Sequence, residues 1–362
     1  MMNKRIGILS FMLGFALFIG SCAKDEPLNT TPENPAYVLE YGNLPAPEIP
    51  GDNPLTMEGV KLGRMLFYEK LLSGDGTQSC AGCHRQEHAF TDTSRFSIGI
   101  AGLPGKRQAM AVFNTLWHKN EFFWDGRAHL LRDQALKPIQ DPLEMNETLA
   151  NVVTKLTALE TYKSQFEKAF GSEEINPQRI SLALEQFMNS IVSADSKYDQ
   201  YLAGKATLSQ EEERGRALFF AEYNPFFPEI SGADCAHCHS GGNFENNQYM
   251  NNGLDSTSAI LDIGREAVTG KPGDKGKFKV MSLRNIALTP PYMHDGRFQT
   301  LEEVIDHYDH GIRYSSSLDP ALQYTMNTGL MLDTQEKADL LAFLKTLSDY
   351  SLLSDPRYSD PN

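Results

Sequence analysis

Four of the five cysteines occur in two identical patterns whose spacing suits haem attachment. Each pattern is C-x-x-C-H, and the residues are Cys80, Cys83, His84, Cys235, Cys238 and His239. Two thiols at this spacing can add to the two vinyl groups of one porphyrin, and the histidine beside them then reaches the iron. A single copy could instead form a zinc knuckle or a redox-active dithiol. Two copies, with only Cys22 remaining, predict two covalently bound c-type haems.

The fifth cysteine, Cys22, follows an apolar N-terminal segment. Lys4 and Arg5 precede fifteen mostly apolar residues, 6–20, which are too few for the ~20 residues of a membrane-spanning helix. This pattern predicts a signal peptide over residues 1–21. The Ile-Gly-Ser sequence before Cys22 is typical of a bacterial lipobox, in which lipid is attached to the cysteine sulfur. An ordinary signal peptide with an incidental cysteine is the alternative. The lipobox predicts an exported, periplasmic lipoprotein, anchored to a membrane without spanning it.

Helix signals predict how the chain positions these residues. Helix-start patterns occur at residues 176–177, 209–212 and 333–336, whereas the alternation typical of strands is scarce. His84 and His239 are 155 residues apart, so each haem would have a domain-sized region of its own. We therefore expect an all-α fold.

The predicted division of the chain follows from its composition. Residues 22–54 are rich in Pro, Asn and Thr and would form a flexible tether. The predicted N-terminal haem domain covers 55–204 and the predicted C-terminal haem domain covers 205–332. A last helix within 333–350 could pack back on the N-terminal domain.

The charge of the chain limits its partners. The formal net charge is -14, and it becomes -16 without residues 1–21, which carry Lys4 and Arg5 and no acidic residue. Such an acidic chain is a poor binder of nucleic acid through bulk charge. It would attract a basic partner at a rate that falls as salt rises.

Several segments outside the haem patterns resemble the bacterial di-haem cytochrome c peroxidase family, in particular its MauG-like branch. These segments are 62–67, 123–128, 142–145, 283–289, 291–296 and 300–303. The resemblance covers residues 55–350. It implies two cytochrome c-like helical domains with one haem each, of which the N-terminal haem reacts with hydrogen peroxide and the other stores or relays electrons.

The resemblance implies that His84 is the proximal ligand of the peroxide-reacting haem. Ordinary family members carry a histidine sixteen residues later that blocks the iron, and that position is Ile100 here. His88 is too near the attachment pattern to be an obvious substitute. We therefore expect an open, five-coordinate iron at rest.

The same resemblance assigns residues around this haem. Glu144 corresponds to the catalytic glutamate, Gln134 and Pro138 to other positions of the distal pocket, and Trp124 to the tryptophan between the haems. One carboxylate could take a proton from peroxide and return it to the departing oxygen. Without the resemblance, Glu144 would be interpreted as a solvated carboxylate at a helix start, and Trp124 as a core aromatic residue.

The second haem would be bound by His239 and Tyr308. Tyr308 lies fourteen residues after His294, where ordinary family members supply a methionine ligand and the MauG-like branch a tyrosine. The predicted helix places it on an apolar face with Leu301, Val304 and Ile305. The alternatives are a core tyrosine, or ligation by Met293, Met326 or Met331. A tyrosinate favours ferric or more oxidised iron, so both haems would share the oxidising equivalents of peroxide.

The family also binds a calcium ion between the haems. Thr289 and Pro291 match positions that supply carbonyl oxygens, and Gln108 stands where the family has an asparagine. Glutamine offers an amide oxygen on a longer arm, and calcium tolerates varied oxygen geometry.

These assignments predict a lipid-anchored di-haem oxidoreductase that reduces hydrogen peroxide. Its electron donor would be a small cytochrome c or copper protein, and a homodimer is compatible with the prediction. One alternative is a membrane-tethered electron carrier without peroxide chemistry, and another is a MauG-like oxidase of a partner protein. Both tryptophans, Trp117 and Trp124, lie in the N-terminal half. The tryptophan through which MauG reaches its protein substrate therefore has no counterpart, and that substrate is not assigned to this chain.

Overall fold

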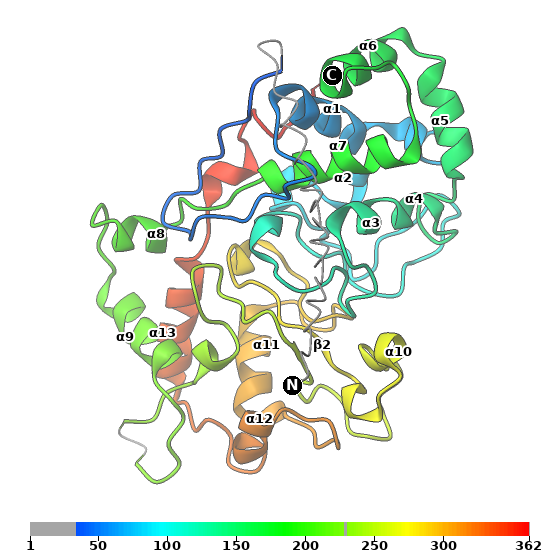
Figure 1. Ribbon diagram of the computed structural model, residues 1–362. Coiled ribbons are helices and arrows are strands. Elements are labelled where there is room, and N and C mark those ends of the chain that lie inside the picture. The colour runs from blue at the N-terminus through cyan, green and yellow to red at the C-terminus, as the bar shows by residue number, and fades with distance from the viewer. Residues whose placement is uncertain (1–33, 228–229, 362) are drawn as a thin grey trace, which may run out of the picture.

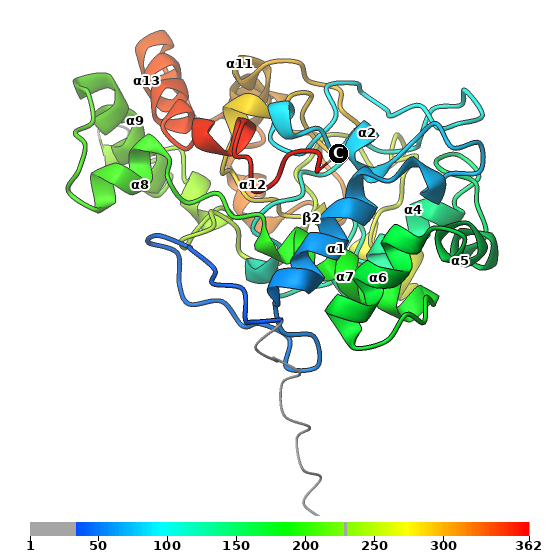
Figure 2. The same ribbon diagram turned by 90° about the horizontal axis from the view of Figure 1, so that it is seen from above.

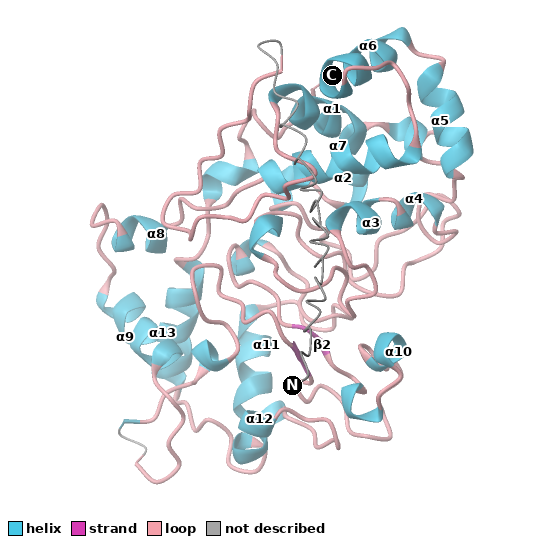
Figure 3. Cartoon of the chain, viewed as in Figure 1, coloured by secondary structure: helices cyan, strands magenta, loops and turns pink. Residues whose placement is uncertain are grey.

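The protein, in a computed structural model, is described over residues 34–227 and 230–361 and forms two helical lobes connected by long loops (Figure 1). Helices and loops make up nearly all of the described residues (Figure 3). The described sheet is a two-stranded antiparallel pair, β1 (Tyr249–Met250) and β2 (Phe278–Lys279). The chain is therefore predominantly helical, as expected. Within the described ranges, no helix combines the length and apolar character that crossing a bilayer requires.

The N-terminal lobe carries short and medium helices around the first cysteine pair. They are α1 (Met57–Tyr68), α2 (Cys80–Cys83), α3 (Leu131–Ala135), α4 (Lys137–Gln140), α5 (Leu149–Thr157), α6 (Glu160–Phe170) and α7 (Pro177–Ser190). Short 3-10 turns lie at η1 (Lys70–Leu72), η2 (Gln86–His88) and η3 (Thr115–Trp117).

The C-terminal lobe has a similar content. Its helices are α8 (Lys197–Leu202), α9 (Gln210–Phe220), α10 (Glu266–Thr269), α11 (Leu301–Asp306), α12 (Pro320–Thr325) and α13 (Thr334–Lys345). Its 3-10 turns are η5 (Cys235–His237), η6 (Pro272–Asp274) and η7 (Ile286–Leu288), and a π-helical turn, η8 (His307–Gly311), follows α11. A last 3-10 turn, η9 (Tyr350–Leu353), follows α13 and packs on the N-terminal lobe.

Helices α1 and α7 form the centre of the N-terminal lobe and lie side by side (Figure 2). Asn176 caps α7, because its side chain accepts a hydrogen bond from the backbone N–H of Arg179. The apolar side chains of one face of α7 and just after it are buried: Ile180, Ala183, Leu184, Phe187 and Ile191. Gly63 of α1 permits the close approach, since a Cβ atom there would collide with the carbonyl group of Ala183.

Helices α9 and α13 play the corresponding role in the C-terminal lobe (Figure 2). Both begin at the capping boxes predicted from the sequence, at Ser209 and Asp333. Phe219 of α9 meets Phe343 of α13 with ring centroids 5.2 Å apart. Each lobe therefore has its own apolar core around one helix pair.

The boundary between the lobes lies before α8, earlier than the predicted position at residue 204. Tyr198 of α8 packs against Phe244 and Phe343 in the C-terminal core. Ile191 and Val192 still belong to the N-terminal core. The Leu-Ala-Gly sequence at 202–204 is the end of helix α8 and not the end of the N-terminal lobe.

The predicted return of the last helix to the N-terminal lobe is also corrected. Helix α13 packs on α9 and α11 of its own lobe, because its apolar side chains complete that core. The chain after it returns instead: Leu352 and Tyr358 are buried in the N-terminal core. Gln86 fixes this tail by donating from Nε2 to the carbonyl oxygens of Leu352 and Asp355, at 3.0 and 2.8 Å.

Residues 34–54 do not form the flexible tether predicted over 22–54. Leu44 is 4% exposed, Ala36 forms an antiparallel bridge with Thr56, and the Trp117 indole donates from Nε1 to the Pro45 carbonyl at 2.8 Å. Such hydrogen bonds pair the backbone polar groups of the segment, so it is ordered against the N-terminal lobe despite its polar, proline-rich composition. The rest of the tether, the signal peptide over 1–21 and Cys22 lie outside the described residues.

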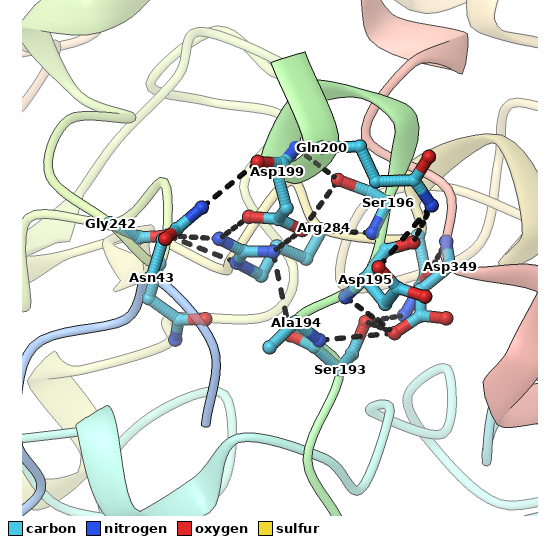
Figure 4. Close-up of polar contacts among 12 residues, drawn as sticks. Asn43, Ser193, Ala194, Asp195, Ser196, Asp199, Gln200, Gly242, Arg284 and Asp349 are labelled. Carbon is cyan, nitrogen blue, oxygen red and sulfur yellow. Dashed lines mark hydrogen bonds and ion pairs between the residues drawn. The ribbon is translucent and has the colours of Figure 1, made fainter. Parts of the chain in front are cut away.

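A buried ion pair stabilises the junction between the lobes (Figure 4). Arg284 binds both carboxylate oxygens of Asp199 at 2.8 and 2.9 Å, and both side chains are 3% exposed. Arg284 also donates to the carbonyl of Gly242 at 2.7 Å. Nearby, the Asp349 carboxylate accepts from the backbone N–H groups of Ala194 and Asp195. Asn114 of the N-terminal lobe donates from Nδ2 to the Ser193 carbonyl at 3.0 Å, so the chain between the two cores is held by both lobes.

Candidate haem cavities and active site

Each lobe encloses a cavity at its cysteine pair. The N-terminal cavity, of about 1020 Å³, is lined by Cys83 and His84. The C-terminal cavity, of about 250 Å³, is lined by Cys235, Cys238 and His239, and its wall is mostly apolar. The two cysteine pairs lie in separate lobes and so cannot combine into one four-ligand metal site. The described ranges hold no cluster of three or more His, Cys, Asp or Glu side chains suited to a bare metal ion.

The two pattern histidines are held in the same way. His84 places Nδ1 3.2 Å from the Phe90 carbonyl oxygen, and His239 places Nδ1 3.0 Å from the Met281 carbonyl oxygen. A histidine that donates through Nδ1 leaves Nε2 for a metal. Burial lowers the pKa of both imidazoles, so they are kept in the neutral form that binds iron.

The cysteines suit thioether formation. All four are free thiols, and burial raises the pKa of Cys80, Cys235 and Cys238 to about 12. Each pair therefore lies beside a cavity, with a neutral histidine at its edge. This arrangement fits a covalently attached haem in each lobe.

Glu144 lies in the wall of the N-terminal cavity together with Gln134 and Pro138. Burial, reinforced by the nearby Asp141 carboxylate and opposed by Arg127, raises the pKa of Glu144 to about 7. The structure thus brings the predicted distal residues into the cavity that contains His84. Their roles in chemistry stay predictions.

Ile100, which stands where ordinary family members carry the blocking histidine, is not part of the wall of this cavity. Ile98 and Gly99 line the cavity, and Ile100 and His88 do not. The backbone N–H of Ile100 donates to the Glu144 carbonyl at 2.9 Å, so the loop is tied to the segment that carries the glutamate.

Trp124 lies between the two cavities and lines both of them. Its indole donates from Nε1 to the Gln108 carbonyl at 2.9 Å. Its own carbonyl accepts a hydrogen bond of 2.8 Å from the Lys279 backbone N–H. The indole is therefore fixed from the N-terminal lobe, and the backbone beside it from the C-terminal lobe.

Tyr308 lines the C-terminal cavity on the predicted face, together with Leu301, Val304 and Ile305. It belongs to the π-helical turn that follows α11, a local distortion that is frequent at functional sites. Burial raises the pKa of the phenol to about 12. Asn252 donates from Nδ2 to the phenol oxygen at 3.4 Å.

Met293 also lines the C-terminal cavity, whereas Met326 and Met331 do not. The amide nitrogen of Asn252 that reaches Tyr308 lies 3.2 Å from the Met293 sulfur. Asn252 thus contacts both side chains that the sequence offered as ligands and that line this cavity.

The residues predicted to bind calcium line a third, smaller cavity of about 80 Å³ that Trp124 borders. Gln108, Thr289 and Pro291 all contribute to its wall. The amide nitrogen of Gln108 donates to Thr91 Oγ1 and to the Asp92 carbonyl, at 3.1 and 3.2 Å. The wall contains neutral oxygen atoms, which can be calcium ligands, but no carboxylate from the described residues.

Comparison with known proteins identifies the family. The family model for di-haem cytochrome c peroxidase matches residues 57–207. A methylamine utilization protein MauG of Methylophilus methylotrophus is 34% identical over 313 residues, which cover 86% of this chain and 87% of that protein. The chain belongs to the di-haem cytochrome c peroxidase family.

Other members of the di-haem cytochrome c peroxidase family agree with this assignment. A cytochrome c551 peroxidase of Nitrosomonas europaea is 36% identical, with 73% of this chain and 76% of that protein covered. The crystal structure of a MauG-like protein associated with microbial copper homeostasis is 38% identical with a TM-score of 0.81, over 90% of this chain and 99% of the other. The resemblance inferred from sequence segments is confirmed: the chain is an oxidoreductase of the haem peroxidase type, and its family implies two c-type haems.

Sequence reasoning missed several cavity residues of this di-haem peroxidase. They are Phe123, Arg127, His118, Asn252 and Lys279. The Arg127 guanidinium lies 3.5 Å from the centre of the Phe123 ring. These two residues carried a signal, because they belong to the family segment 123–128. The other three reach the cavities from loops or a two-residue strand, where no periodicity marks them.

Proposed function

We propose that this di-haem peroxidase reduces hydrogen peroxide to water with electrons from an external donor. The observation that supports this function is Glu144, whose pKa is raised to about 7 in the wall of the cavity that contains His84. A carboxyl group that titrates near neutral pH can accept a proton and return it within one reaction.

In this mechanism the bound haems supply the redox chemistry. His84 would hold the iron of the N-terminal haem, and Glu144 would take a proton from peroxide bound in the same cavity. Glu144 then returns that proton to the departing oxygen, which leaves as water. Gln134 orients peroxide from the same wall. Two electrons and two further protons complete the conversion of one peroxide to two waters.

The two haems divide the work in this proposal. Ile100 replaces the blocking histidine and does not line the cavity, so His84 would be the protein's one ligand to the N-terminal iron and peroxide could reach the other side. His239 and Tyr308, which both line the C-terminal cavity, would hold the second iron, and a phenolate ligand would favour the oxidised states of that iron. Trp124, which borders both cavities, carries oxidising equivalents between them.

The proposals for the electron donor, the membrane anchor and the calcium ion are those predicted from the sequence. The acidic chain favours a small basic cytochrome c as donor. A copper protein is a second candidate, because the 38% identical MauG-like protein is associated with microbial copper homeostasis. Cys22 anchors the exported protein to a membrane through lipid. Calcium occupies the cavity between the haems, bound by oxygens of Gln108, Thr289 and Pro291.

Peroxide-dependent oxidation of a partner protein is a second candidate function. Tyr308 supports it, because a tyrosine ligand favours storage of oxidising equivalents over storage of an electron. Relatives named MauG, such as the 36% identical protein of Methylorubrum extorquens, also favour it.

Electron paramagnetic resonance of the resting ferric protein tests the proposal. We expect one high-spin haem, from the open N-terminal site, and one low-spin haem. Stopped-flow mixing with peroxide should then change the haem spectrum before any donor is added. Two low-spin haems and no rapid reaction with peroxide would identify an electron carrier. Mixing with reduced cytochrome c or with candidate partner proteins separates the two peroxide-dependent functions.

A further inference from the structure

Lys279 places a buried ammonium group between the two haem cavities. The residue belongs to β2, is 4% exposed and lines both cavities. Its backbone N–H donates to the Trp124 carbonyl at 2.8 Å. The position of Lys279 is therefore fixed to the residue that separates the cavities.

The ammonium group has no carboxylate partner at ion-pair distance in the described part of the chain. Its closest aromatic contact is the Phe122 ring, whose centroid lies 5.3 Å from Nζ. A cation–π contact of this length is a weak substitute for a counter-ion. Burial lowers the pKa of Lys279 to about 8, although the carboxylates of Glu245 and Glu121 oppose the shift.

Both of these carboxylates are engaged elsewhere. Glu245 lies 2.6 Å from His118 Nδ1 and accepts from the Asn243 amide at 2.9 Å. Glu121 pairs with Arg265 at 3.2 Å and accepts from the Tyr249 hydroxyl at 3.0 Å. A buried charge without a partner strongly disfavours folding, so the site is built for an anion that comes from outside the chain.

The other lysine and arginine side chains of the two cavity walls are either paired with carboxylates or exposed to solvent. Arg107 pairs with Asp125 and Asp262, both at 2.7 Å, and Arg127 pairs with Asp125 at 3.0 Å. Lys106 is exposed to solvent. Lys279 is thus a buried cation without a carboxylate partner, and it borders both cavities.

We propose that Lys279 is the shared electrostatic partner of a propionate group from each haem, and hence a positioning residue that couples the two haems beside Trp124. The proposal rests on the proposed function only in requiring one haem in each cavity. Each haem carries propionate carboxylates on an otherwise apolar ring, which is the anion that these cavities would receive. The positive charge of Lys279 then favours the ferrous over the ferric state of both irons.

Redox titration of the holoprotein tests this proposal. Lys279→Met removes the charge and keeps the length of the side chain, and Lys271→Met is the matched control because Lys271 is exposed. We expect Lys279→Met to lower both midpoint potentials and to shift the propionate bending bands of both haems in the resonance Raman spectrum. Lys271→Met should leave all four quantities unchanged, and Lys279→Arg should restore the potentials toward the wild-type values.

A change at one haem only, or at neither, would overturn the shared role. The melting temperature of the holoprotein is a second, independent test. Lys279→Met should lower the melting temperature if propionates neutralise the ammonium group, and should raise it if the charge is unpaired. Lys279→Gln is a second uncharged variant, with the same expected fall of both potentials. Haem content and the rate of reaction with peroxide are measured separately, so failure of the proposed function is distinguishable from failure of this inference.

Discussion

The two haem cavities are alike where the haem would be attached and different on the facing wall. Both have a cysteine pair and a neutral histidine that places Nδ1 against a backbone carbonyl. The N-terminal cavity adds a carboxyl group, an amide and a guanidinium from Glu144, Gln134 and Arg127. The C-terminal cavity is smaller and mostly apolar, and presents Tyr308. The residues for attachment are thus common to both lobes, and the proposed difference in chemistry, proton transfer in one cavity and electron transfer in the other, depends on the facing wall.

The largest expected effect is on the N-terminal wall. Glu144→Gln keeps the shape of the side chain and removes the acid–base group, so the reaction with peroxide should slow by roughly 10²–10⁴-fold. Stopped-flow spectroscopy measures this rate, and Glu160→Gln is the control because Glu160 is exposed. An unchanged rate would show that Glu144 takes no part in the mechanism. The main proposed difference in function between the two cavities would then be lost.

The second prediction concerns the junction that both regions share. Arg284→Met leaves Asp199 buried without its partner, and breaking a buried pair costs about 3–5 kcal/mol of folding free energy. Chemical denaturation of the holoprotein measures this loss. Arg357→Met is the control, since the Arg357 side chain is 48% exposed and exposed pairs contribute about 0–1 kcal/mol. Equal losses for the two variants would contradict a structural role of the buried pair.

The third prediction is a pH dependence that only the N-terminal cavity should confer. In the proposed mechanism Glu144 acts first as a base, so its charged form is the active one, and burial raises its pKa to about 7. The rate with peroxide should therefore fall below pH 7, by about tenfold per pH unit. Glu144→Gln should abolish this slope. A slope that persists in the variant would assign the titration to another group.

The same comparison explains what the sequence could and could not predict. Attachment residues are local in the chain, so the two haem patterns were readable, and the capping boxes at Ser209 and Asp333 gave the starts of the main C-terminal helices. Residues 34–54 were misjudged because their packing depends on partners far along the chain, such as Trp117.

The contacts in the region between the two cavities were the hardest to predict from the sequence. Lys279 carries no periodic signal, since it lies in a two-residue strand and meets Trp124 across 155 positions. The predicted lobe boundary was wrong for a related reason. Tyr198 of α8 belongs to the C-terminal lobe because of its contacts with Phe244 and Phe343, and no change in composition marks this position. Local motifs thus predict which residues attach a cofactor, whereas long-range contacts decide what surrounds it.

The smallest expected effect is on the C-terminal wall, at the hydrogen bond from Asn252 to Tyr308. Asn252→Ala removes a donor that favours the phenolate, and a bond of this kind contributes about 1 kcal/mol. Protonation should then displace Tyr308 from the iron more easily. The acid transition of the low-spin spectrum should move up by about 0.7 pH unit, without loss of the N-terminal peroxide reaction.

An optical pH titration of the ferric protein measures this transition, with Asn327→Ala as the control because Asn327 is exposed. Tyr308→Phe is the extreme case, because the acid transition should disappear together with the phenolate ligand. If Tyr308→Phe leaves the low-spin spectrum unchanged, Met293, whose sulfur lies 3.2 Å from the same Asn252 amide, becomes the ligand. The second haem would then favour its ferrous state, and the contrast between the cavities would change from two oxidising centres to one oxidising centre and one electron store.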